Sequence, residues 1–195
     1  MSESDNIVAE TATRIFADLA DPQTINAAKD DSWKAPLWNA LEENGLTLAW
    51  VPDDLGGAGA GLADGFEVVL AAGRYAAPVP IMETLLAGWL LAQGRIAAPP
   101  GMMTVAPMRL KERVALDADG TLSGRTHGIP FAYDAVHVAV LAHSVNGPAI
   151  ALVEKAALRL RETRGIAGNV LHELIFDAVK PVQVANAPAG LDQNT

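Results

Sequence analysis

The feature that most constrains the fold is a change in apolar spacing at Pro99-Pro100-Gly101. Before this tripeptide, apolar residues recur every three or four positions, as they do in amphipathic helices; after it they alternate in short runs, as in half-buried strands. Proline and glycine also interrupt regular structure, so the tripeptide is the best domain boundary in the chain. We therefore predict an α+β fold. It has an all-helical domain over residues 1–100, a small antiparallel β-sheet or barrel domain over 101–185, and a linker tail over 186–195.

The first hundred residues predict four or five helices with broad apolar faces. Ser4 or Asp5 is positioned to cap the first helix, Ser32 to cap the helix that carries Trp33, and Pro80 to open the last one. The polar stretch from Thr24 to Asp31 is expected to connect the first two helices. The residues expected to face inward are Val8, Ala12, Ile15, Phe16 and Leu19; Trp33, Leu37, Ala40, Leu41 and Asn44; Leu62, Phe66, Val69, Leu70 and Gly73; and Ile81, Met82, Leu85, Leu86, Trp89 and Leu90.

Two turn signals predict hairpins in the second half. Asn146-Gly147 lies between the apolar runs 136–142 and 149–153, and Ala118-Asp119-Gly120 lies between runs 113–117 and 121–125. Dipeptides of this kind favour the tight turns that join antiparallel strands. Further strands are expected over residues 158–163, 173–176 and 182–185.

The composition excludes several classes of protein. The 195-residue chain is 50% hydrophobic, has no cysteine and carries a net charge of −9. Such acidity disfavours a nucleic-acid partner, and the lack of cysteine excludes disulfides and thiolate metal sites. The acidic start lacks the basic region of a signal peptide, and the apolar run 85–92 is too short to span a bilayer. We expect a cytoplasmic protein without a membrane segment.

The glycine-rich turn at residues 56–61 admits two interpretations. An apolar run at 46–51, a glycine loop and a helix follow the order of a Rossmann nucleotide site. The spacing disfavours that interpretation, because the third glycine would fall at Leu62. Asp53 and Asp54 would also place negative charge where a pyrophosphate must approach.

The second interpretation is a resemblance, and it covers nearly the whole chain. Ordered motifs in both halves resemble the amino-terminal helical domain and the middle β domain of the acyl-CoA dehydrogenase family. They are Glu43-x-Gly45-Leu46, Val51-Pro52-Asp53, Gly56-Gly57-x-Gly59, Gly73-Arg74, Pro78-x-Pro80, Asp119-Gly120-x-Leu122-Ser123-Gly124, Ala132-x-Asp134-Ala135 and Ile175-Phe176-Asp177-x-Val179-x-Pro181. The chain departs from the family pattern at Asp53, where a glutamate is usual, at Ala71-Ala72, where an acidic pair is common, and at Pro181, which comes one place early.

The resemblance implies α,β-dehydrogenation of an acyl-CoA thioester with FAD as the hydride acceptor. In the family the catalytic base comes from a carboxy-terminal four-helix domain that these 195 residues do not include, so we assign no catalytic residue. The positions carried over for flavin binding are Thr104, Ile129, Pro130 and Phe131. The loop after Thr104 is shorter than in the family, and Pro130 offers neither an N–H nor a hydroxyl group. We therefore expect weak or absent FAD binding by this chain alone.

Three functions remain open at this stage. The chain is part of an acyl-CoA dehydrogenase-type flavoenzyme of lipid or steroid degradation, a non-catalytic partner subunit of a heteromeric enzyme, or a Rossmann-type nucleotide-binding module. A homo- or hetero-oligomer is expected, because the helices ending at Arg74 and Gly94 carry more apolar surface than this chain can cover. These surfaces comprise Phe66, Val69 and Leu70 on one helix and Leu85, Leu86, Trp89 and Leu90 on the other.

Other chemically suggestive residues have ordinary structural interpretations. Asp53 and Asp54 are expected to be turn and cap residues. His127, His137, His143 and His172 are expected to be surface or hydrogen-bonded strand residues, since only His137 and His143 share a strand face and a zinc site needs more ligands. The methionines at positions 102, 103 and 108, and Trp89, are expected to fill the core rather than to line an acyl pocket.

Overall fold

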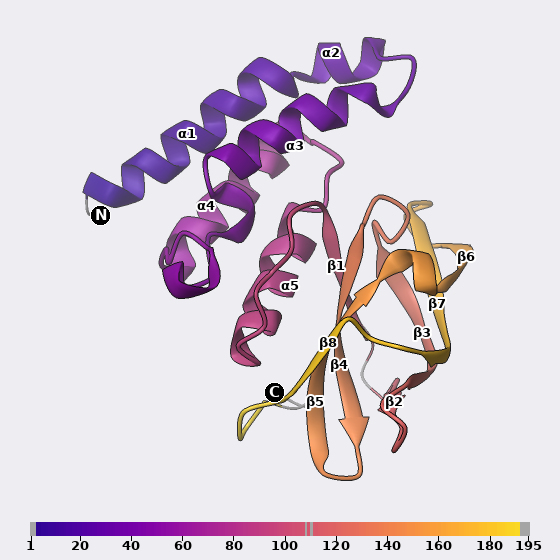
Figure 1. Ribbon diagram of the computed structural model, residues 1–195. Helices are drawn as coiled ribbons and strands as arrows, with labels where there is room; N and C mark the ends of the chain where they lie inside the picture. Colours follow the sequence, from indigo (N-terminus) through magenta and orange to yellow (C-terminus); the bar gives the residue numbers. More distant parts are fainter. Residues whose placement is uncertain (1–2, 108, 110, 192–195) are drawn as a thin grey trace.

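The computed structural model describes residues 3–107, 109 and 111–191, with helices first and a sheet afterwards (Figure 1). The fold class predicted from the sequence is thereby confirmed. The α-helices are α1 (Glu3–Leu19), α2 (Pro22–Ala27), α3 (Lys34–Glu43), α4 (Leu62–Arg74) and α5 (Ile81–Gln93). Three single turns of 3₁₀-helix lie between them, over Asp31–Trp33, Leu46–Leu48 and Asp53–Leu55.

Local capping explains the helix boundaries and one error in the prediction. The carboxylate of Asp21 accepts hydrogen bonds from the N–H groups of Gln23 (3.0 Å) and Thr24 (3.3 Å), and Pro22 occupies the first turn. These are the features of a helix start, so α2 forms where the sequence suggested a polar connection. Asp30, not Ser32, supplies the side-chain cap before α3, by accepting from the N–H of Ser32. Gly45 ends the helical segment in the left-handed conformation, as predicted.

The glycine-rich turn is not part of a Rossmann unit. Residues 46–51 form a 3₁₀ turn and bends, not a strand, and no helix alternates with parallel strands in the described chain. Gly57 is required because a Cβ there would overlap the backbone of Val51. Asp53 lies in this turn, and Asp54 forms an exposed ion pair with Arg95 at 2.8 Å. The nucleotide-module hypothesis is therefore wrong, and the two aspartates are turn residues as predicted.

Helix α4 presents a different face to the core from the one predicted. Its buried residues are the small ones, Gly65, Val68, Ala71 and Ala72. The larger apolar residues point outward: Leu62, Phe66 and Leu70 are 64%, 40% and 53% exposed. In α5 the predicted inward positions are largely confirmed, with Ile81, Leu85 and Leu90 buried, but Met82 is 40% exposed. The face of α4 that is buried carries small residues, because Trp50 and α1 pack too close to it for larger side chains.

The second half forms one mixed, mostly antiparallel sheet of eight strands. Its strands are β1 (Met103–Ala106), β2 (Val114–Leu116), β3 (Leu122–Pro130), β4 (His137–Ser144), β5 (Gly147–Glu154), β6 (Arg159–Arg164), β7 (Val170–Val179) and β8 (Gln183–Asn186). The order across the sheet is β6-β7-β3-β2-β4-β5-β8, with β1 parallel to β4. Both predicted hairpins form, since β2 pairs with β3 and β4 with β5. Strand β1 lies in a segment that the sequence indicated only as a loop.

Helix α5 joins the two halves of the molecule. It lies between the other helices and the sheet, beside β1 (Figure 1). Ala87, Leu90 and Leu91 share an apolar cluster with residues of β1, β4 and β5, and the hydroxyl of Thr84 bonds both backbone groups of Met103. The N–H of Met103 donates to Thr84 Oγ1 at 3.0 Å, and that hydroxyl donates to the Met103 carbonyl at 3.2 Å. A buried strand end is thus satisfied by a helix side chain.

Two glycines of α4 provide a matched test of how closely Trp50 packs against this helix. A Cβ at Gly65 would overlap the indole of Trp50, whose Nε1–H donates to the carbonyl of Leu62 at 3.1 Å. Gly73, in the same helix, has no atom within 4 Å of its Cβ position. We expect Gly65→Ala to lower the free energy of unfolding by about 1–3 kcal/mol through overpacking. Gly73→Ala should raise it by roughly 0.5–1 kcal/mol through helix propensity. Urea denaturation measures both, and equal effects would contradict the close approach of Trp50.

Candidate functional site

The main cavity that involves predicted site residues lies where the helical half meets the sheet. Its volume is about 620 Å³, within the roughly 300–1,000 Å³ usual for sites that hold small ligands. The helical half contributes the start of α3 and the segment before α5, and the sheet contributes the end of β3, the turn after it, β6 and the start of β7. The lining residues are Asp31, Lys34, Pro78, Pro130, Phe131, Tyr133, Asp134, Glu162, Asn169, Val170 and His172.

The four predicted flavin-site residues come together, but only two of them reach this cavity. Pro130 and Phe131 line it. Thr104 and Ile129 are fully buried behind it, and Thr104 Oγ1 donates to the Pro130 carbonyl at 3.0 Å. Phe131 follows β3 with a φ of 51°, a left-handed conformation that is uncommon for an aromatic residue. The strained turn holds Phe131 at the wall of the cavity.

Pro130 cannot supply a hydrogen-bond donor to the edge of a flavin ring. Pro130 has no N–H, and its carbonyl already accepts a hydrogen bond from Thr104. At Gly128, a Cβ would lie 3.2 Å from Nε of Arg109, so this loop side chain packs over the strand just before Ile129. We therefore derive no chemical step at a flavin held by this chain alone, and the flavin role of the four positions stays a prediction.

An ion pair ties the cavity wall of α3 to the turn after β3. Lys34 Nζ lies 2.8 Å from both Asp31 Oδ2 and Asp134 Oδ1. Burial lowers the pKa of Lys34, but its hydrogen bonds to Asp134 and Asp31 raise it more, so the net pKa lies above the ordinary value. The lysine is thus held charged at the cavity, where it forms ion pairs with both carboxylates.

His172 is the polar residue of the cavity that the sequence interpretation missed. It is only 6% exposed, and its Nδ1 atom is buried without a hydrogen-bond partner in the described part of the chain. The prediction of a surface or hydrogen-bonded histidine is therefore wrong here. The signal was present in the strand alternation, because Leu174 and Phe176, at the same parity of β7, are core residues. His137 also has a buried Nδ1 atom with no hydrogen-bond partner among the residues that the structure describes, whereas His143 contacts Arg113.

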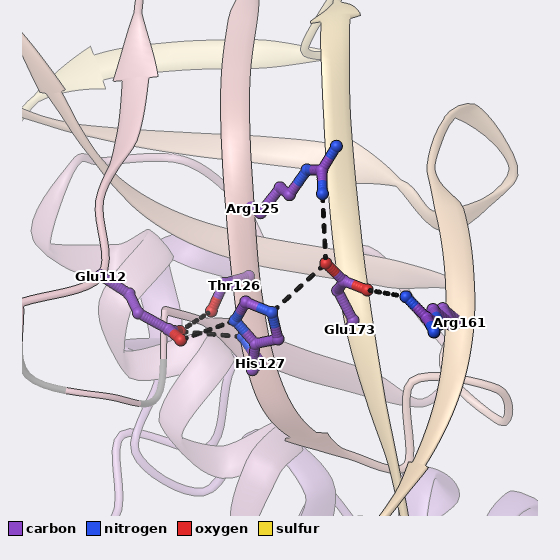
Figure 2. Close-up of polar contacts among 6 residues, drawn as sticks. All are labelled: Glu112, Arg125, Thr126, His127, Arg161 and Glu173. Atoms are coloured by element: carbon purple, nitrogen blue, oxygen red, sulfur yellow. Dashed lines mark hydrogen bonds and ion pairs between the residues drawn. The ribbon is translucent and has the colours of Figure 1, made fainter.

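The outer face of β3, β7 and β6 carries a separate polar cluster (Figure 2). Its centre is Glu173, which is 5% exposed and lies beneath His127, Arg125 and Arg161. His127 Nε2 is 3.3 Å from Glu173, and His127 Nδ1 is 2.7 Å from Glu112. The imidazole therefore links two carboxylates that come from a loop and from a strand. Figure 2 shows Glu112 reaching across from the loop before β2 to β3.

Glu112 gathers three hydrogen bonds at that contact. Its carboxylate accepts from the hydroxyl of Thr126 at 2.9 Å, from the N–H of His127 at 2.8 Å and from the His127 ring. Burial raises the pKa of Glu112, but these bonds and the nearby imidazole lower it further, so the net pKa is below its ordinary value. The ionised carboxylate is a fixed anchor of the loop, not a proton carrier at neutral pH.

The carboxylates at the cavity form ion pairs, and no metal-binding cluster lies among the described residues. Among residues 3–107, 109 and 111–191, no group of three or more His, Asp or Glu residues could hold a metal ion. At the cavity itself, Asp31 and Asp134 are paired with Lys34, and Glu162 lies 3.3 Å from Arg164. Burial raises the pKa of Glu83, on the first turn of α5, but Glu83 does not line the cavity. A smaller cavity of about 350 Å³ lies at the glycine turn, where the nearest carboxylate, Glu42, accepts a hydrogen bond from Gly101.

Comparison with known proteins supports the resemblance. No family model matches the chain. The acyl-CoA dehydrogenase IpdE2 of Mycobacterium tuberculosis is 30% identical over 125 residues, which are 63% of this chain and 39% of that protein. A variant of the Tcur3481-Tcur3483 steroid ACAD is 27% identical to this chain and has a TM-score of 0.74. The match covers 95% of this chain and 56% of the solved chain. The chain thus spans little more than half the length of that solved chain.

Two further solved structures share the fold. The ChsE4-ChsE5 complex of Mycobacterium tuberculosis matches 94% of this chain and 56% of its own, with 20% identity and a TM-score of 0.73. An acyl-CoA dehydrogenase from Bacillus anthracis, solved with FAD, matches 95% of this chain and 38% of its own, with 20% identity and a TM-score of 0.61. The arrangement of helices followed by a mostly antiparallel sheet is that of the amino-terminal and middle domains of acyl-CoA dehydrogenases. The chain is therefore similar in sequence and in fold to the first part of acyl-CoA dehydrogenases.

The carboxylate of Glu112 gives a pH-dependent test of the polar cluster. Because the pKa of Glu112 is lowered on folding, its stabilising contribution is present above the ordinary value of 4.5 and is lost as pH falls through the folded pKa. We expect Glu112→Ala to lower the free energy of unfolding by about 1–3 kcal/mol at pH 7. The difference from the wild type should shrink below about pH 4.5. Urea denaturation across pH measures it, with Glu154→Ala, at an exposed strand end, as the control. A pH-independent difference would contradict this account.

Proposed function

We propose that this chain is one component of an acyl-CoA dehydrogenase-type flavin oxidoreductase that acts on acyl-CoA thioesters of ring-containing compounds. The observation that carries the proposal is the match to a steroid ACAD over 95% of this chain at 27% identity. The chain would contribute the helical and β scaffold and the cavity between them. When bound in the assembly, FAD would accept the hydride in the dehydrogenation.

The proposal assigns the catalytic base to a polypeptide segment outside these 195 residues. Asp31 and Asp134 both form ion pairs with Lys34. General-base catalysis needs an unpaired group within hydrogen-bond reach of the carbon acid. The missing donors at Pro130 favour the related possibility that this chain is the non-catalytic partner of a heteromer whose homologue holds the flavin. Both versions predict that the chain alone is inactive.

An exposed apolar stripe on α4 supports assembly with a partner. Leu62, Phe66 and Leu70 lie four residues apart and are all at least 40% exposed. Residues at this spacing line one face of a helix, the geometry that a second helix covers when it packs alongside. The related Tcur3481-Tcur3483 steroid ACAD and ChsE4-ChsE5 complex each pair two chains, which favours a second acyl-CoA dehydrogenase chain as the occupant.

The activity of the purified chain tests the first part of the proposal. We expect no turnover of acyl-CoA substrates with an artificial electron acceptor, and no stoichiometric flavin in the visible spectrum. Co-expression with each acyl-CoA dehydrogenase chain of the same organism, one at a time, should yield a yellow complex that oxidises acyl-CoA. Turnover by the chain alone would refute the assignment of the base. Failure of every pair to bind flavin or to turn over substrate would refute the oxidoreductase role.

The α4 stripe can be tested separately by light scattering. We expect the double variant Leu62→Ser/Leu70→Ser to weaken the complex at least tenfold, because two anchors of the buried face are removed. The matched control is Val145→Ser, which changes an apolar residue that is 92% exposed at a hairpin tip. Equal complex formation by both variants would show that the partner docks elsewhere.

A further inference from the structure

A second cavity lies at the end of α3, away from the larger cavity that Asp31 and Lys34 line. Its volume is about 350 Å³, at the lower end of the range usual for sites that hold small ligands. The end of α3, the glycine-rich turn and the connection between the two halves form its walls. The lining residues are Glu42, Gly45, Thr47, Leu48, Gly56, Gly57, Ala58, Ala98 and Pro100.

This cavity contains a buried hydroxyl group without a partner. Thr47 is only 3% exposed, and its side chain makes no hydrogen bond within the part of the chain that the structure describes. Unlike the ring nitrogens of Trp38 and His172, its Oγ1 atom is not fully enclosed by protein. The hydroxyl therefore faces the cavity that Thr47 lines. Because a hydroxyl group both donates and accepts, it can receive a hydrogen bond from a ligand.

Glu42 adds a carboxylate with one unpaired oxygen. Its Oε1 atom accepts a hydrogen bond from the N–H of Gly101 at 2.6 Å, and Oε2 has no partner among the described residues. Among the described residues that line this cavity there is no Lys, Arg or His. The nearby cation Arg95 is already paired with Asp54 at 2.8 Å. The negative charge of Glu42 is therefore left for a ligand to balance.

The surroundings favour a cation with a short hydrocarbon stem. Residues 1–100 contain 14 Asp or Glu and 5 Lys or Arg, a difference of −9 that equals the net charge of the whole chain. Such a surplus raises the local concentration of small cations. The remaining side chains of the lining are apolar and suit an alkyl chain; they are Leu48, Ala58, Ala98 and Pro100.

The hydrogen bond from Gly101 selects among the possible cations. A guanidinium group binds best when it donates to both oxygens of a carboxylate, and Gly101 already occupies one of them. An ammonium group is a compact charge with three donors, so it can serve Glu42 and Thr47 together. A metal ion is disfavoured, since no group of three or more metal-binding side chains lies among the described residues.

We propose that this cavity binds a primary alkylammonium ion, which donates to Oε2 of Glu42 and to Oγ1 of Thr47. Its alkyl stem lies against Leu48 and Ala98. The site shares no lining residue with the larger cavity and does not depend on the proposed oxidoreductase function.

The test uses the full chain without a partner or flavin. The probe is n-butylamine, which is an ammonium ion at neutral pH, and calorimetry measures its affinity. We expect a dissociation constant on the order of 1 mM, in keeping with so small a ligand. Amide ¹H–¹⁵N NMR locates the site. The signals of Gly56, Gly57 and Gly101 should shift, because the first two line the cavity and Gly101 donates to Glu42.

Control ligands separate the charge, the donors and the shape of the probe. Butan-1-ol keeps the stem without the charge, tetramethylammonium keeps the charge without a donor, and n-butylguanidine replaces the ammonium by a planar fork. We expect each to bind at least fivefold more weakly than n-butylamine. Nα-acetyl-lysine N-methylamide carries the same ammonium on a peptide unit. Affinity within about threefold of n-butylamine assigns the site to a lysine side chain, and weaker binding assigns it to a free amine.

Substitutions test the two polar partners. Glu42→Gln keeps an acceptor for Gly101 but removes the charge, and should weaken n-butylamine binding at least tenfold. Thr47→Val removes the hydroxyl and should weaken binding about three- to tenfold, whereas Thr47→Ser should stay within about threefold of the wild type. The matched control is Glu43→Gln, which changes the exposed next residue of α3 and should leave affinity unchanged. Thermal unfolding checks that each variant is folded.

Several results would overturn the inference. One is no n-butylamine binding to the wild type at tens of millimolar, and another is binding that leaves the Gly101 signal unshifted. Equal affinity for butan-1-ol would remove the role of charge, and tighter binding of n-butylguanidine would remove the ammonium preference. Equal losses in Glu42→Gln and Glu43→Gln would show a general charge effect instead of a site. Because binding is measured without turnover, the oxidoreductase assays neither rescue nor refute this result.

Discussion

The contact on which the rest of the structure depends is the seat of α5 on the sheet. Thr84 satisfies both backbone groups of Met103, and the apolar face around Leu91 packs on β1, β4 and β5. Without that contact the helices and the strands would be two small units joined by a proline-rich connection. With it, the start of α3 is held opposite the end of β3 and the start of β7, and a cavity lies between them. The cavity is thus a product of the packing of the two halves, not of either half alone.

The ion pair of Lys34 with Asp134 plays a second, more local part in the same docking. These residues are a hundred positions apart, and both side chains are largely buried. A partly buried pair adds modest stability but fixes geometry, because leaving either charge unpaired is costly. It therefore sets the relative position of the two cavity walls. It also holds the carboxylate of Asp134 in an ion pair at the cavity wall.

Much of the fold was predictable because its signals are local. The hairpin turn at Asn146-Gly147 and the left-handed stop at Gly45 depend on a few neighbouring residues, and both form as expected. The face of α4 was not predictable from apolar periodicity, because Trp50, twelve or more residues away, packs against Gly65 and turns the large residues outward. Likewise Thr104 and Pro130 were placed together by resemblance, whereas Lys34 and His172 reach the cavity only through tertiary packing that no local pattern reports.

Phe131 provides the aromatic wall of the cavity at a cost to the stability of the chain. A non-glycine residue in the left-handed region costs roughly 1–2 kcal/mol, and glycine would remove that cost. Glycine would also remove the aromatic wall of the cavity. At this position the stability of the turn and the aromatic lining of the cavity are therefore in opposition. Laboratory evolution for thermal tolerance alone would be drawn to this residue, and a chain optimised in that way would fold better while losing its pocket.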